Sequence, residues 1–216
     1  LTRSSWADYD KSLISKGGGV FDRKAKSIKI SSEIRNVLDI TDKELSPNDL
    51  IKAILKSPVG LLWNGGIGTY VKSESESDNE VGDPANDILR VNGSELRCRV
   101  IGEGGNLGFT QRGRIEYALN GGQVNTDAMD NSAGVDCSDH EVNIKIALTS
   151  AMLSKKITLK ERNKILESMT NEVSELVLED NRLQNQAIAI ANSQGVLAIG
   201  EQSQFLNTLE KSGFLN

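Results

Sequence analysis

Apolar residues in the first 150 positions follow two alternating patterns, one helical and one strand-like. The helical pattern is clearest in LIKAILK (50–56), where Ser46 can cap the helix and Pro47 suits its first position. The strand-like pattern is a continuous apolar run, VGLLW at 59–63. Such a run is typical of a parallel strand that is covered on both faces.

The alternation continues through the middle of the chain. Strands are predicted at 96–101 and 123–127, and between them Thr110 can cap a helix that runs to Leu119. Alternating strands and helices predict a parallel sheet with helices on its faces. The fold class is therefore α/β.

The last third of the chain shows helical patterns only. Ser138 and Thr158 each begin a capping box, in which Glu141 and Glu161 supply the acidic partner. The predicted boundary lies between 1–150, the α/β part, and 151–216, the helical part. Helices are expected at 142–153, 158–178, 183–195 and 201–213.

Composition restricts the class of protein. The 216 residues are 38% hydrophobic and 25% charged, which suits a packed core, and the net charge of -5 disfavours nucleic acid as a partner. No apolar run suggests a membrane span and no signal peptide opens the chain, so a cytoplasmic location is expected.

Residues 72–86 are polar and acidic, as in a solvated surface insertion. Because the chain begins with Leu1 and no preceding strand, we expect it to be part of a longer polypeptide.

Two glycine-rich turns follow predicted strands. Asn64 begins the turn NGGIG, and GEGGNLG at 102–108 contains Asn106. Ligands of parallel sheets bind outside the carboxyl ends of the strands, and glycines let the backbone approach a ligand closely. Each turn is either a ligand contact or an ordinary tight turn. Neither has the G-x-G-x-x-G spacing of a dinucleotide-binding loop.

The segment that leads to Ser138 offers another polar group at a predicted helix start. Ser138 can cap the helix, or it can present its hydroxyl together with the free helix amides to a carboxylate. His140 is the single histidine, and no cysteine or second histidine stands at ligand spacing. The sequence therefore favours no metal site and no catalytic role for His140.

Three segments of the chain resemble the large NAD-specific glutamate dehydrogenases of bacteria. The resemblance runs from about Arg3 to Leu148, and the block from Val100 to Lys145 is its most specific part. The segments are SSWADYDKSLISKGGGVFDRKAKSI (4–28), LLWNGGIGTYVKS (61–73) and VGDPANDILRVNGSELRCRVIGEGGNLGFTQRGRIEYALNGGQVNTDAMDNSAGVDCSDHEVNIKI (81–146).

The resemblance implies a Rossmann-like sheet and the oxidative deamination of L-glutamate to 2-oxoglutarate and ammonia, with NAD as the cofactor. The wider superfamily has a Gly-Ala-Asn turn near the nicotinamide ribose, and Gly104, Gly105 and Asn106 stand in its place. It also has the motif Asn-Ala-Gly-Gly-Val-Thr-Val-Ser, which is similar to the stretch from Asn131 to Ser138. By this resemblance Asn131 lies close to the nicotinamide and the substrate, and Ser138 helps to hold a substrate carboxylate.

The resemblance also concerns other residues and the extent of the chain. Asn64 resembles residues that line the cofactor cleft, and Ala133 replaces a family glycine. The catalytic lysine and aspartate of the superfamily have no counterpart here, so no catalytic residue is predicted in this chain. Residues 1–150 then correspond to the distal part of the NAD-binding domain, the chain alone should not turn over, and the full-length enzyme is expected to be a homo-oligomer.

The sequence alone leaves two alternatives open. Another amino-acid dehydrogenase, acting on leucine or phenylalanine, would need an apolar substrate pocket, and the polar pair Asn131 and Ser138 disfavours it. A non-catalytic module would instead use the amphipathic tail from Thr158 for assembly with other domains or subunits.

Overall fold

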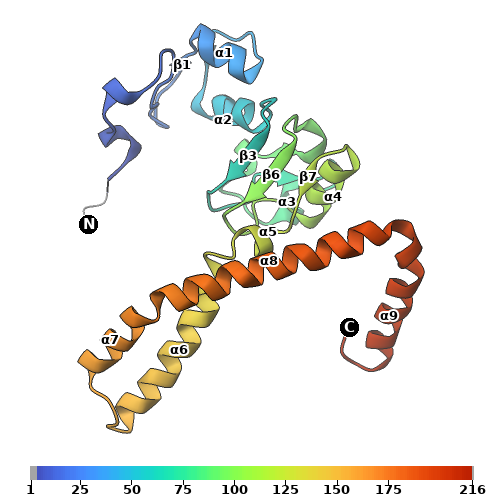
Figure 1. The fold of residues 1–216 in the computed structure, drawn as a ribbon. Helices are drawn as coiled ribbons and strands as arrows, with labels where there is room; N and C mark the ends of the chain where they lie inside the picture. Colours follow the sequence, from blue (N-terminus) through green and yellow to red (C-terminus); the bar gives the residue numbers. More distant parts are fainter. Residues whose placement is uncertain (1–3, 216) are drawn as a thin grey trace. The chain divides into compact units, whose positions relative to one another are not determined.

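The computed structural model describes residues 4–215, and it divides into two compact units between Asn131 and Ser132. Among residues 4–215, the strands belong to the first unit and the second unit is helical. Figure 1 shows the strands of the first unit and the long helices of the second. Among the described residues, no helix combines the length and the apolar character needed to cross a bilayer.

A three-stranded parallel sheet lies at the centre of the first unit. Its strands are β3 (Leu61–Asn64), β6 (Val100–Glu103) and β7 (Gln123–Val124), in the order β3-β6-β7 (Figure 1). The α/β prediction is confirmed. However, β6 begins later than the predicted strand at 96–101, because the 3-10 turn η4 (Gly93–Glu95) precedes it and Leu96 is buried in the core.

Two predicted helices flank the sheet. The helix α2 (Pro47–Leu55) begins after Ser46, whose hydroxyl accepts the Asp49 amide, as the sequence predicts. The helix α4 (Gln111–Leu119) begins after Thr110, whose hydroxyl accepts the amide of the third helical residue. They contribute to one core cluster, which consists of Leu55, Val71, Val91, Leu96, Cys98, Ile101, Phe109 and Tyr117.

The two faces of the sheet differ in coverage. Leu62 and Ile101 are register neighbours and pack in the core, whereas the side chains of Leu61 and Trp63 are 57% and 59% exposed. Alternate residues of a strand point to opposite faces. The prediction of a strand covered on both faces is therefore wrong for the described part of the chain, because only one face of β3 is packed there.

A smaller substructure precedes the sheet. It contains the 3-10 turns η1 (Trp6–Asp8) and η2 (Lys11–Leu13), the antiparallel strands β1 (Ile28–Lys29) and β2 (Glu44–Leu45), and the helix α1 (Ser32–Leu38). Its apolar side chains form a second cluster around Ile28, Ile30, Leu38 and Leu50. Because Leu50 belongs to α2, this cluster ties α2 to the N-terminal substructure.

The polar stretch at 72–86 is organised by one buried cation. It lies between β4 (Val71–Lys72) and η3 (Asp87–Leu89), which leads into β5 (Val91–Asn92), and it contains α3 (Asp78–Val81). The guanidinium of Arg90 is fully buried and pairs with Asp78 and Asp87, at 2.6 Å each. Asp78, within this stretch, and Asp87, just after it, therefore balance a charge inside the fold.

The second unit is a series of helices. They are α6 (Val135–Leu153), α7 (Leu159–Ser168), α8 (Thr170–Gln194), the 3-10 turn η5 (Gly195–Ala198) and α9 (Ile199–Lys211). The chain doubles back after α6, so that α8 packs along α6 (Figure 1). The capping box of Thr158 and Glu161 is confirmed. The single helix predicted at 158–178 is two helices, which are separated at Met169.

Candidate functional site

The two glycine-rich turns lie against each other at the carboxyl ends of β3 and β6. The amide of Gly105 donates to the carbonyl of Asn64 at 3.1 Å, and the Thr69 hydroxyl donates to the Leu107 carbonyl at 2.7 Å. The parallel register, in which Asn64 stands opposite Glu103, brings both turns to one edge of the sheet. The structure therefore brings together Asn64, Gly104 and Gly105, which the sequence predicts for the cofactor site.

The glycines of the second turn are required by packing within the fold. A Cβ atom at Gly102 or Gly104 would lie 2.4 or 2.5 Å from the indole of Trp63. A Cβ at Gly105 would lie 2.3 Å from the carbonyl oxygen of Gly66. The expected reason for these glycines was close approach to a ligand, but the structure gives them a different one. They let the Trp63 ring and the first turn pack against the second.

Asn64 directs its side chain into this contact. A Cβ at Gly108 would lie 2.0 Å from the Asn64 side-chain nitrogen, so the carboxamide occupies the space that Gly108 leaves. Its oxygen faces the Gly66 amide at 3.4 Å. The Asn64 side chain therefore fills the space between the two turns.

Asn106 and Asn131 meet at the surface of the first unit. Asn106 is exposed in the second turn, and Asn131 follows α5 (Asp127–Asp130). The Asn131 Nδ2 donates to the Asn106 Oδ1. This hydrogen bond brings together Asn106, which the resemblance implies near the nicotinamide ribose, and Asn131, which it implies near the nicotinamide.

Two carboxylates, one at each end of α5, fix this helix to the turn. The Asp130 carboxylate accepts a hydrogen bond from the Glu103 amide at 2.9 Å. The Asp127 carboxylate accepts one from the Leu107 amide at 2.7 Å. The N–H groups of a turn bind a carboxylate well, because such hydrogen bonds are assisted by charge. The position of Asn131 relative to Asn106 therefore depends on both aspartates.

A buried ion pair lies beneath the turn. Glu103, the last residue of β6, is fully buried, and Arg114 of α4 donates to it from Nε at 2.6 Å and from Nη2 at 3.0 Å. Burial raises the pKa of Glu103, and the contact with Arg114 opposes part of that rise. Arg114 also contacts Asp127 at 3.1 Å, so that one guanidinium links β6, α4 and α5.

Sequence reasoning missed this pair. Glutamate and arginine are usually exposed in proteins, so nothing in their residue types indicated that Glu103 and Arg114 are buried together. One signal was present in the pattern, because Glu103 falls in register with the core-facing side of β6.

The prediction that Ser138 caps a helix is wrong. The helix α6 begins at Val135, and Ser138 is its fourth residue. The chain already turns before Val135, and the carbonyl of Ser132 accepts the amides of Asp136 and Cys137 at 3.0 and 3.1 Å. Those two helix amides are thereby occupied. Ser138 is exposed, so its hydroxyl is still accessible to a ligand.

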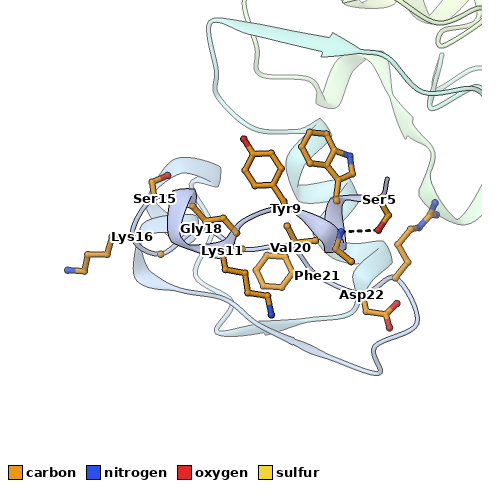
Figure 2. A pocket seen from close by; sticks show the side chains of 15 residues that line it. Ser5, Tyr9, Lys11, Ser15, Lys16, Gly18, Val20, Phe21 and Asp22 are labelled. Atoms are coloured by element: carbon orange, nitrogen blue, oxygen red, sulfur yellow. Dashed lines mark hydrogen bonds between the residues drawn. The ribbon is translucent and has the colours of Figure 1, made fainter. Parts of the chain in front are cut away.

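A large hollow of the first unit lies away from these turns, at the N-terminal segment. It encloses about 1010 Å³ and is lined by residues of the segment 5–23, none of which the sequence predicts for the site. Figure 2 shows Tyr9, Val20 and Phe21 around it, with Lys16 extending outward. Aromatic, apolar and charged side chains all line this hollow. None of its lining residues belongs to the two glycine-rich turns.

Comparison with known proteins identifies relatives over nearly the whole chain. The family described as bacterial NAD-glutamate dehydrogenase, catalytic domain, matches residues 1–191. The NAD-specific glutamate dehydrogenase of Halomonas elongata is 56% identical over 213 residues, and that of Pseudomonas aeruginosa is 54% identical over 216. These alignments cover 99% and 100% of this chain, but 13% of each relative. The chain therefore spans a small part of the length of the relatives it matches.

Proposed function

Because this chain belongs to the family of bacterial NAD-glutamate dehydrogenase catalytic domains, we propose that it forms the nicotinamide end of the active site in such an enzyme. The full-length protein would oxidise L-glutamate to 2-oxoglutarate and ammonia while it reduces NAD. The observation that carries this proposal is the contact of Asn106 with Asn131 beside two strand ends of a parallel sheet. Crevices at such strand ends are the usual sites for nucleotide cofactors.

The two asparagines suit the carboxamide of nicotinamide. Their mutual hydrogen bond uses the Nδ2 of Asn131 and the Oδ1 of Asn106. Each side chain retains its other polar atom, an acceptor on Asn131 and a donor on Asn106. A primary carboxamide offers one donor group and one acceptor, so it can bond to both. This arrangement would orient the ring for hydride transfer, whose chemistry the cofactor supplies when it is bound.

Ser138 is the proposed contact for a carboxylate of the substrate. It is an exposed hydroxyl in the first turns of α6, where the helix dipole favours a negative charge. We propose that the groups that accept and donate protons during the reaction belong to other parts of the full-length protein. The chain alone would then be inactive.

Replacing Ser138 with alanine in the full-length enzyme should raise the KM for glutamate more than the KM for NAD. A hydrogen bond to a charged group contributes about 1.5–3 kcal/mol, or roughly 10- to 100-fold in affinity. Steady-state kinetics with each substrate varied in turn measures both constants. Ser150→Ala, an exposed change on the same helix, serves as the control. Equal changes in the two constants would refute a substrate contact at Ser138. In the wild-type enzyme, higher activity with leucine than with glutamate would favour a different amino-acid dehydrogenase.

A role in assembly is a second candidate function for the helical unit. In α9 the side chains of Phe205 and Leu206 are 62% and 51% exposed, and in α8 that of Ile190 is 53% exposed. Apolar side chains that gather on a helix surface mark contacts with other chains or domains. We propose that a neighbouring subunit covers this surface in a homo-oligomer of the full-length enzyme. The proposed location of that enzyme is the cytoplasm. A protein that assembles but does not bind NAD would favour assembly as the sole role of this chain.

A further inference from the structure

Three side chains that can bind a metal converge between α6 and α8. The Nε2 of His140 lies 3.6 Å from a carboxylate oxygen of Asp136 and 3.2 Å from one of Asp180. One ligand atom from each residue lies within 4.8 Å of the others. Asp136 and His140 are four residues apart on α6 and share one face of it, whereas Asp180 comes from α8.

These separations match those of a metal coordination sphere. Zinc binds imidazole nitrogen at about 2.0–2.1 Å and carboxylate oxygen at about 2.0–2.2 Å, so neighbouring ligands of a tetrahedral ion lie about 3.4 Å apart. The two distances from His140 fall on either side of that value. The His140 nitrogen and each carboxylate oxygen are therefore close to the separation that a shared ion requires, and the two carboxylate oxygens lie within 4.8 Å of each other.

Asp136 supplies independent support. Its Oδ2 is buried and has no hydrogen-bond partner among the described residues. A buried carboxylate oxygen without a donor is costly, and a cation is one way to satisfy it. The other oxygen of the same carboxylate faces His140, so an ion bound there would lie within reach of both oxygens.

The charges of the cluster also favour a divalent cation. Within residues 4–215, neither Asp136 nor Asp180 forms an ion pair with a lysine or an arginine at 4.0 Å or less. The nearby cations have other partners, because Lys145 pairs with Glu141 and Arg182 pairs with Glu179. Two carboxylates around a neutral imidazole would leave a charge of about -2, which one divalent ion neutralises.

We propose that Asp136, His140 and Asp180 form a binding site for a divalent first-row transition-metal ion that links α6 to α8. An imidazole ligand favours zinc, copper, iron or nickel over magnesium and calcium. The turn that precedes α6 is also joined to α8 at this end, because the Nδ2 of Asn181 donates to the Ser132 hydroxyl at 3.1 Å. This second link holds Asp180 beside α6, so the site is largely formed before the ion binds. The proposal does not depend on the function of the glycine turns.

Metal titration of the full-length protein tests the site. After treatment with a chelator, Zn²⁺ is added and its binding is followed by calorimetry for the wild type and for His140→Gln, Asp180→Asn and Asp139→Asn. Asp139 is an exposed neighbour on α6 outside the cluster, so its variant is the matched control. We expect the first two variants to lose one equivalent of zinc per chain, or to bind it at least about tenfold more weakly. The control should bind as the wild type does.

A second measurement needs no variant. His140 is the only histidine of this chain, so its modification by diethyl pyrocarbonate can be assigned by mass spectrometry to one peptide. Zn²⁺ should protect that peptide in the wild-type protein, and the chelator should remove the protection. Equal zinc binding by all four proteins, or modification of His140 that zinc does not slow, would overturn the proposal. Either result would mean that contacts among the three side chains, without a metal ion, account for the cluster.

Discussion

Replacing Arg114 with methionine is expected to lower the free energy of unfolding of the first unit by about 3–5 kcal/mol. The change would leave the carboxylate of Glu103 fully buried without its cation, and the Phe109 amide at 3.2 Å would be its remaining donor. Removal of one partner from a buried pair costs more than the pair itself contributes, because the other charge stays desolvated. Urea unfolding followed by tryptophan fluorescence measures the loss.

Two further variants separate the buried charge from other effects. Arg112→Met changes an exposed arginine on the same helix and should alter stability by no more than about 0.5 kcal/mol. The double variant Arg114→Met with Glu103→Leu removes both charges and should recover much of the lost stability. If Arg114→Met costs no more than Arg112→Met, the pair does not stabilise the turn.

Replacing Gly105 with alanine should reduce kcat/KM for NAD in the full-length enzyme by about 100-fold. The added methyl group would lie 2.3 Å from the Gly66 carbonyl oxygen, which belongs to the backbone and cannot rotate away. The two turns would have to separate, and Asn106, the next residue, would move with them. A displacement of about 1 Å near a reacting group can cost a factor of this size.

Gly60→Ala is the matched control for this experiment. Gly60 precedes β3, and a Cβ atom there would meet nothing within 4 Å. This variant should keep nearly all of its activity. Similar losses for the two variants would mean that the contact between the turns does not position the cofactor site.

Local signals in the sequence predict much of the fold. Ser46, Thr110 and Thr158 each precede a helix because a side-chain oxygen satisfies a free amide, and this effect depends on few neighbours. The same reasoning fails at Ser138. Residues before it already form a turn that uses the Ser132 carbonyl, so the helix begins earlier than the cap signal. A competing local structure of this kind is not visible in the spacing of single residues.

Long-range contacts account for what the sequence could not predict in the candidate site. Glycines at strand ends indicated that something approaches the backbone, but only the register of β3 and β6 shows that Trp63 does so. His140 and Asp180 are 40 residues apart, and their contact requires α8 to pack along α6. The resemblance identified Asn106 and Asn131, and the structure adds their hydrogen bond.

The most direct test of the proposed nicotinamide contact compares two ligands of the full-length enzyme. Equilibrium binding of NAD and of ADP-ribose, which lacks nicotinamide, is measured for the wild type, Asn131→Ala and Asn163→Ala. Asn163 is exposed on α7 and serves as the control. We predict that Asn131→Ala weakens NAD binding by about tenfold, as the loss of one or two hydrogen bonds would, and leaves ADP-ribose binding unchanged. Equal weakening of both ligands, or unchanged binding of NAD, would contradict the assignment.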